Sequence, residues 1–194
     1  MTTPAWRQAL NKSLDSNKHL KYSTFFQIAT TRPDGRPANR TVAFRGFMDK
    51  TDRLTFTTDT RTQKTKDLNH KDWAEACWYF PDSREQYRLL GHLTLIGKDS
   101  SDKELSQERL KAWSECSETN RKWFSGPNPG KPKAETSDAD HQDINVRSNE
   151  DPPVDSFALA VLDITEVDYV DLLKNVRDRH EPQSSGWNKI PVNP

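Results

Sequence analysis

Strand-like segments separated by short turns constrain this chain more than any other feature. Short runs rich in Phe, Ile, Val and Thr follow one another along the sequence. The clearest turn between them is Pro33-Asp34-Gly35-Arg36-Pro37, where proline fixes its own φ and glycine accepts a positive φ. Strands joined by short turns pair antiparallel, because parallel strands need long crossover connections. The pattern therefore predicts an antiparallel barrel or sandwich and argues against alternating βαβ units.

The expected elements make the protein mainly β (α+β), with a few peripheral helices. Strands are expected at Tyr22–Thr31, Ala38–Phe47, Arg53–Thr58, Ala74–Phe80, Glu85–Ile96 and within Phe157–Leu172 and Val176–Val192. Helices are expected at Pro4–Asp15, Thr62–Asn69 and Ser101–Phe124. In the last helix, apolar spacing predicts burial of Leu105, Leu110, Trp113 and Trp123.

A polar segment interrupts this pattern. The 194 residues predict a single domain over 1–194, yet the hydrophobic share of 32% is low for a globular chain. Much of the deficit lies in Ser125–Asp155, which is almost empty of large apolar residues. A flexible polar insertion is one interpretation, and an active-site lid is the other, since long loops that persist are often functional.

Charge and cysteine content exclude several classes of function. Lys plus Arg and Asp plus Glu both number 29, so the net charge is zero and a general attraction to nucleic acid is not expected. No apolar run approaches membrane-spanning length, and no secretory signal is apparent. A cytoplasmic location with free thiols at Cys77 and Cys116 is therefore expected. The histidines and cysteines show no paired ligand spacing, so no metal site is predicted.

Two neighbouring segments carry residues suited to binding a phosphate. Arg40–Phe47 and Leu54–Leu68 combine hydroxyls and cations on two strands and the start of a helix. Phosphate recognition uses such fixed donors and positive charge, and a helix N-terminus adds to it. From the residues alone, solvated surface charge is the alternative interpretation for Arg40 and Lys64.

Four blocks in order resemble the pyridoxamine 5′-phosphate oxidase-like FMN-binding split barrels. Arg40–Phe47 is similar to the family's Arg-x-Val-x-x-Lys/Arg-Gly-Phe strand, and Leu54–Leu68 to its strand, turn and Lys-bearing helix. Phe80–Gly91 is similar to its aromatic-Pro turn followed by Gln-x-Arg-x-x-Gly, and Arg177–Arg179 to its Asp-Arg element. The resemblance covers nearly all of the chain from Tyr22 onward except the insertion.

The resemblance implies an antiparallel split β-barrel that binds FMN at the interface of a homodimer. It implies that Arg40 and Lys64 grip the phosphate, with Gln63 and Thr58 nearby, and that Thr41, Val42 and Thr57 line the flavin. It places Arg45 near the flavin and substrate, and brings Gln86 and Arg179 to the ring from the second subunit. It assigns no catalytic residue, no membrane contact and no metal.

Some of these positions have structural alternatives. An interface ion pair with Asp178 or another acid is the alternative role for Arg179. Gln86 and Arg88 share one face of a strand, and we expect Gln86 to be functional and Arg88 to be structural or to contact the second subunit. The late position of Trp187 is compatible with a contact to the flavin.

The substrate side of the family pattern is less well kept than the flavin side. Gln63 stands where the oxidases usually have arginine, and Trp113, Ser117 and Arg121 stand at the positions of their substrate-phosphate residues. Asn175-Val176-Arg177 replaces their Arg-x-His element. The leading hypothesis is an FMN-dependent oxidoreductase of unknown substrate. A non-catalytic FMN-binding module, such as a flavin store, sensor or electron-transfer partner, is the second, and a split barrel for heme or deazaflavin is the third.

Overall fold

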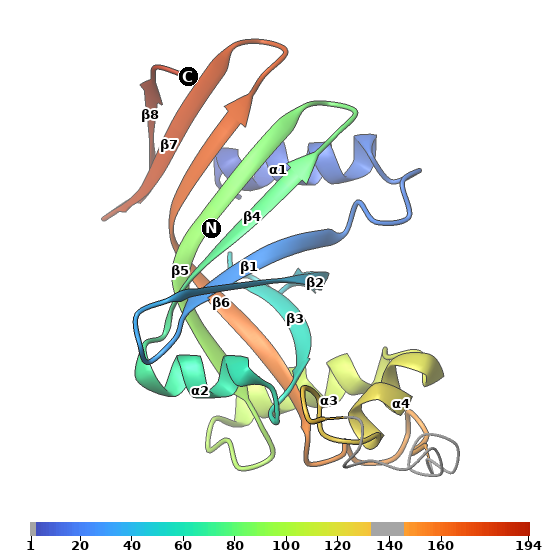
Figure 1. Ribbon diagram of the computed structural model, residues 1–194. Coiled ribbons are helices and arrows are strands. Elements are labelled where there is room, and N and C mark those ends of the chain that lie inside the picture. The colour runs from blue at the N-terminus through green and yellow to red at the C-terminus, as the bar shows by residue number, and fades with distance from the viewer. Residues whose placement is uncertain (1–2, 133–145) are drawn as a thin grey trace.

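A closed antiparallel barrel dominates the computed structural model, which describes residues 3–132 and 146–194 (Figure 1). The strands run in the order β3-β2-β1-β4-β5-β6, and β6 returns to pair with β3. Their bounds are β1 Phe25–Thr31, β2 Pro37–Phe47, β3 Leu54–Asp59, β4 Trp73–Phe80, β5 Glu85–Ile96 and β6 Phe157–Asp171. The sheet continues beyond β6 into β7 (Val176–Gln183) and β8 (Gly186–Val192). The predicted split-barrel fold is confirmed.

Helices cover the two ends of the barrel. They are α1 Ala5–Ser16, α2 Gln63–His70, α3 Lys103–Ser114 and α4 Glu118–Ser125. In Figure 1, α1 lies toward the upper end, and α2, α3 and α4 gather at the lower end. Trp6 of α1 is buried and packs edge-on against Trp187, with 5.4 Å between ring centroids. Trp187 thus closes the core beneath α1, which is a structural use of the side chain that we had linked to the flavin.

The region predicted as one helix over Ser101–Phe124 forms two. Ser117 starts α4 by accepting a hydrogen bond from the amide three residues later (3.3 Å), and a serine in this position favours a new helix over continuation of the old one. The resulting change of direction alters which faces are covered. Trp113 is buried as predicted, but the predicted burial of Leu110 and Trp123 is wrong, because these side chains are 50% and 75% exposed.

The insertion is described only at its two ends. Residues 133–145, which the flexible-insertion prediction includes, lie outside the described residues. At the second end, Trp113 Nε1 donates to the carbonyl of Ser148 (3.2 Å), and Arg109 donates to the carbonyls of Val154 (3.1 Å) and Phe157 (3.0 Å). The chain before β6 is therefore attached to α3.

The barrel splits between β2 and β3. These strands pair only from Phe44↔Phe56 to Phe47↔Leu54, with a bulge at Arg45. Beyond that, residues 40–43 pair with β1 and residues 57–59 pair with β6, without pairing with each other. Phe44 donates its backbone N–H toward the β1 side, to Thr24 (2.8 Å). By the two-residue alternation of an antiparallel ladder, the backbone groups of residues 41 and 43 point the other way, toward this unpaired β2–β3 edge.

Gly91 provides a test of how tightly the strands cross. A Cβ at this position would overlap the backbone of Asp163, where the β5–β6 register shifts. Gly91→Ala should therefore lower the free energy of unfolding by about 2 kcal/mol in urea titrations, since overpacking displaces backbone. Gly97→Ala is the matched control, because nothing lies within 4 Å of its added Cβ. Equal stability of the two variants would contradict this close approach.

Candidate functional site

A buried lysine lies at the start of α2. Lys64 is 5% exposed, and its Nζ donates to Thr58 Oγ1 on β3 (2.5 Å). No carboxylate of the described residues lies within ion-pair distance of this Nζ; Asp59 and Asp67 act on it only from farther away. Burial, followed by the charge of Arg40, lowers the pKa of Lys64 from 10.5 to about 8. A buried cation without a close counter-ion is costly and is suited to receiving an anion.

Arg40, which lies near Lys64, has a carboxylate partner within the protein. Arg40 Nη1 donates to Thr30 Oγ1 (2.7 Å), and its Nη2 lies 3.3 Å from Oδ2 of the fully buried Asp67. Asp67 also accepts from Thr30 (2.8 Å) and from Gln63 Nε2 (3.1 Å). Burial raises the pKa of Asp67, but these hydrogen bonds outweigh it and hold the pKa below its ordinary value. Arg40 is thus partly neutralised, which leaves Lys64 as the cation without a close partner in this cluster.

Four of the predicted phosphate residues are brought together here: Arg40, Thr58, Gln63 and Lys64. Asp67, which holds two of them in place, was missed by the sequence reasoning. Its spacing could have revealed it, because residues three and four apart on a helix share one face. Gln63, which stands in place of a family arginine, donates a hydrogen bond from its side-chain amide to Asp67.

The predicted flavin-lining residues lie along the unpaired β2–β3 edge. Thr41 is exposed, Thr57 is half-buried, and Val42 packs partly against the barrel core. Arg45 is exposed at the bulge, and it makes no hydrogen bond or ion pair with any residue in the described parts of the chain. This edge therefore offers backbone groups, hydroxyls and one free guanidinium next to the Lys64 cluster.

Gln86 and Arg179 lie elsewhere on the barrel surface. One register row runs from Thr41 through β1, β4, β5 and β6 to Arg179. The barrel also closes through β3, but along β6 the partners of Thr57 and Arg179, which are Leu159 and Asp168, lie nine residues apart, or roughly 30 Å. Arg179 pairs with Glu181 (2.7 Å) and Glu166 (3.5 Å). Within one chain, Arg179 is therefore remote from the unpaired edge, and so is Gln86, three strands away from β2.

Trp113, Ser117 and Arg121, which stand at the positions of the family's substrate-phosphate residues, make contacts within this chain. Trp113 is 1% exposed and Ser117 caps α4. Arg121 donates to the carbonyls of Cys116 and Arg147. Each of these side chains thus has a contact that holds α3, α4 or the segment before β6 in place.

Across residues 3–132 and 146–194, no group of three or more His, Cys, Asp or Glu side chains could hold a metal ion. In the same residues, no helix has the length and apolar content needed to cross a membrane.

Comparison with known proteins agrees with this geometry. Residues 3–97 match the family model described as pyridoxamine 5′-phosphate oxidase, FMN-binding domain. The chain is 36% identical to pyridoxine/pyridoxamine 5′-phosphate oxidase 2 of Arabidopsis thaliana, over 97% of this chain and 96% of that protein. A pyridoxamine 5′-phosphate oxidase-related, FMN-binding protein from Nostoc punctiforme has a TM-score of 0.90 at 40% identity, covering all of both chains. PhzG from Burkholderia lata shares the fold at 19% identity (TM-score 0.77, 97% and 91% covered).

The fold and these relatives define a split barrel of the flavin-binding class. The chain belongs to the pyridoxamine 5′-phosphate oxidase FMN-binding family, and FMN is its cofactor. The residues around Lys64 fit such a group, since a buried lysine, a hydroxyl and a helix N-terminus suit a phosphate.

The lowered pKa of Lys64 makes stability depend on pH. Between pH 8 and 10.5 the unfolded chain binds a proton at this residue that the folded chain has released, so stability rises with pH there. Lys64→Met removes the titrating group. The free energy of unfolding of FMN-free wild type should therefore rise relative to that of Lys64→Met as the pH increases from 8 to 10.5. The change in this difference should be at most about 3 kcal/mol. Urea unfolding of both FMN-free proteins measures it, and a pH-independent difference would contradict the burial of a charged Lys64.

Proposed function

We propose that this protein is an FMN-dependent oxidoreductase whose cofactor phosphate binds at Lys64. The observation that carries the proposal is the buried Nζ of Lys64 at the start of α2, which has a hydroxyl partner and, in residues 3–132 and 146–194, no close carboxylate. Arg40 supports the same site from β2, and Asp67 holds it in place. When bound, FMN supplies the hydride chemistry, while the protein supplies position and electrostatics.

The protein's own residues divide this work along the barrel. Lys64 and Arg40 hold the phosphate end with Thr58 and Gln63 nearby, and Thr41, Val42 and Thr57 line the ring along the unpaired β2–β3 edge through backbone and hydroxyl groups. Arg45, with no partner among the described residues, places a positive charge on the open side of the site, where an anionic group of a substrate would be favoured.

We propose further that two copies of the chain complete the site. Gln86 and Arg179 are too far from the unpaired edge to act on their own chain's flavin. In a homodimer, both residues would instead contact the flavin bound to the other subunit. The outer face between these regions carries Phe25 and Tyr79, which are 47% and 44% exposed. They lie on the paired strands β1 and β4. Exposed aromatic side chains of this size are typical of interfaces.

The alternative function, a non-catalytic FMN-binding module, has one observation in its favour. Trp113 and Ser117, at positions of the substrate-phosphate helix, are committed to the core and to a helix cap. The name of the Arabidopsis relative keeps pyridoxamine 5′-phosphate among the substrates to test, although we expect it to be a poor one. A cytoplasmic location, in keeping with the free thiols of Cys77 and Cys116, remains part of the proposal.

Cofactor binding and turnover can be measured on the same variants. Lys64→Met should weaken FMN binding about 10- to 100-fold, because a charge-assisted hydrogen bond is lost. Lys66→Met, an exposed lysine on the same helix, is the matched control and should bind FMN normally. Flavin fluorescence titration measures the affinity, and unchanged binding by Lys64→Met would show that the phosphate lies elsewhere. Oxygen consumption with phosphorylated amines and alcohols then distinguishes an oxidoreductase, which turns over, from a binding module, which does not.

The dimer proposal predicts the effect of a charge on the outer face. Phe25→Glu should convert the protein to monomer in light scattering and weaken FMN binding as well, since the partner's residues would be removed from the site. Leu110→Glu is the control, because Leu110 is similarly exposed (50%) but lies on α3. A wild-type protein that is monomeric while saturated with FMN would refute the two-copy site.

A further inference from the structure

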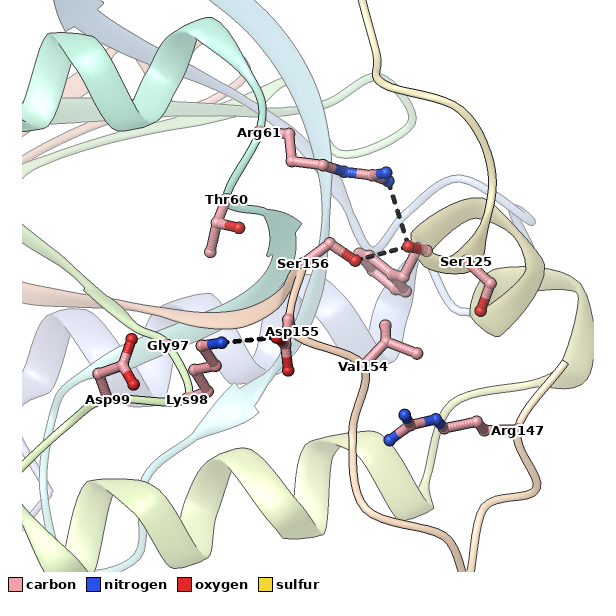
Figure 2. A pocket seen from close by; sticks show the side chains of 11 residues that line it. Thr60, Arg61, Gly97, Lys98, Asp99, Ser125, Arg147, Val154, Asp155 and Ser156 are labelled. Carbon is pink, nitrogen blue, oxygen red and sulfur yellow. Dashed lines mark hydrogen bonds and ion pairs between the residues drawn. The ribbon is translucent and has the colours of Figure 1, made fainter. Parts of the chain in front are cut away.

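Arg61 connects the end of β3 to the end of α4 through hydrogen bonds that the sequence did not predict. It belongs to a basic cluster, Arg61–Lys66, and such a cluster in a chain of zero net charge is expected to bind a small anion or to face solvent. In the structure its guanidinium forms a fork on Asp59, with Nε–Oδ1 at 3.0 Å and Nη2–Oδ2 at 2.6 Å. The same group donates to the carbonyls of Phe124 (3.1 Å) and Gly126 (2.8 Å) at the end of α4. Figure 2 shows the side chain reaching across to that end.

These contacts join two parts of the chain that are far apart in sequence. Asp59 ends β3 and is 7% exposed, and Arg61 lies in the turn that leads to Lys64. On the other side, the last carbonyls of a helix have no partner within the helix and favour a cation. Ser156 Oγ donates to the same Phe124 carbonyl (2.5 Å). The turn that carries the proposed phosphate site thus also holds the end of α4.

α4 buries little of its own surface. None of its eight residues is fully buried, although Phe124 packs partly against Phe157. The contacts of Arg61 lie at the wall of an open pocket of about 680 Å³ that includes Thr60, Phe124 and Ser156 (Figure 2). A helix with little buried surface is a low-stability element whose position depends on individual polar contacts.

The other end of α4 begins shortly after the end of α3. Burial raises the pKa of Cys116, just before α4, and the charges of Arg45 and Arg121 oppose that rise. Met48, which directly follows β2, belongs to a buried cluster against which Ala112 of α3 packs. The end of β2 that carries Arg45 therefore lies near the helix that leads into α4.

We propose that Arg61 is a positioning residue that couples FMN binding at the Lys64 turn to the position of α4. The inference rests on the proposed placement of the phosphate. Binding that fixes the turn fixes Asp59 and Arg61, and Arg61 then holds the carbonyls that end α4. By linkage the effect is reciprocal, so a well-held α4 also favours FMN binding. α4 consequently becomes ordered when the cofactor is present.

Hydrogen exchange on the full-length protein, with and without saturating FMN, tests the coupling. In wild type, we expect FMN to slow amide exchange in α4 about fivefold or more. In Arg61→Gln, saturated with FMN, this FMN-dependent slowing should be lost, and FMN affinity should fall by the same factor. Arg7→Gln is the matched control. Arg7 also forms an ion pair with an aspartate, Asp52 (2.8 Å), but Arg7 lies on α1, at the other end of the barrel. It should leave the response of α4 unchanged.

Arg61→Lys provides a second variant if Arg61→Gln does not fold. Lysine keeps the positive charge next to Asp59 but lacks the planar guanidinium that binds Asp59 and the carbonyls at the end of α4 at the same time. The coupling should therefore be lost while FMN still binds. Wild-type coupling in Arg61→Lys, or no FMN-dependent change of α4 in wild type, would overturn the proposal. Full FMN binding by Lys64→Met would instead show that the placement of the phosphate is wrong, which separates the two failures.

Discussion

The partial pairing of β3 is the constraint on which the rest of the structure depends. β3 pairs with β6 along its whole length but with β2 only near one end. The first contact closes the barrel, and the second leaves backbone groups of β2 and β3 without a strand partner between them. Because unpaired strand groups are costly unless something binds them, the closure of the fold and the place for a ligand arise from the same three-strand junction.

The charges at this junction are matched unequally. Asp67 accepts from Arg40, Thr30 and Gln63, so the arginine has a partner inside the protein. Among the residues that the structure describes, Lys64 has only the hydroxyl of Thr58 within hydrogen-bond distance of its Nζ. This inequality leaves one buried cation for the proposed phosphate, although Gln63 replaces an arginine of the family pattern. Burial strengthens the electrostatic interaction of the remaining lysine.

Much of the fold and part of the site could be predicted from the sequence, and the failures have physical causes. Turn chemistry and strand composition act locally, so the order of strands and the antiparallel pairing were readable. The prediction of a single helix over Ser101–Phe124 was wrong because the capping preference of Ser117 was not taken into account. Leu110 and Trp123 follow helical spacing, but spacing does not say whether a neighbour covers that face.

By itself, the sequence determined the succession of strands, the family and the chemical types of the residues proposed to bind the phosphate, because these follow from local propensity and from residue identity. Only the tertiary structure decided which cation lacks a close partner, that Arg61 serves α4 instead of an anion, and that Arg179 lies far from Thr41 in one chain. Those outcomes depend on distances between residues remote in sequence, and such distances are set by the closure of the barrel.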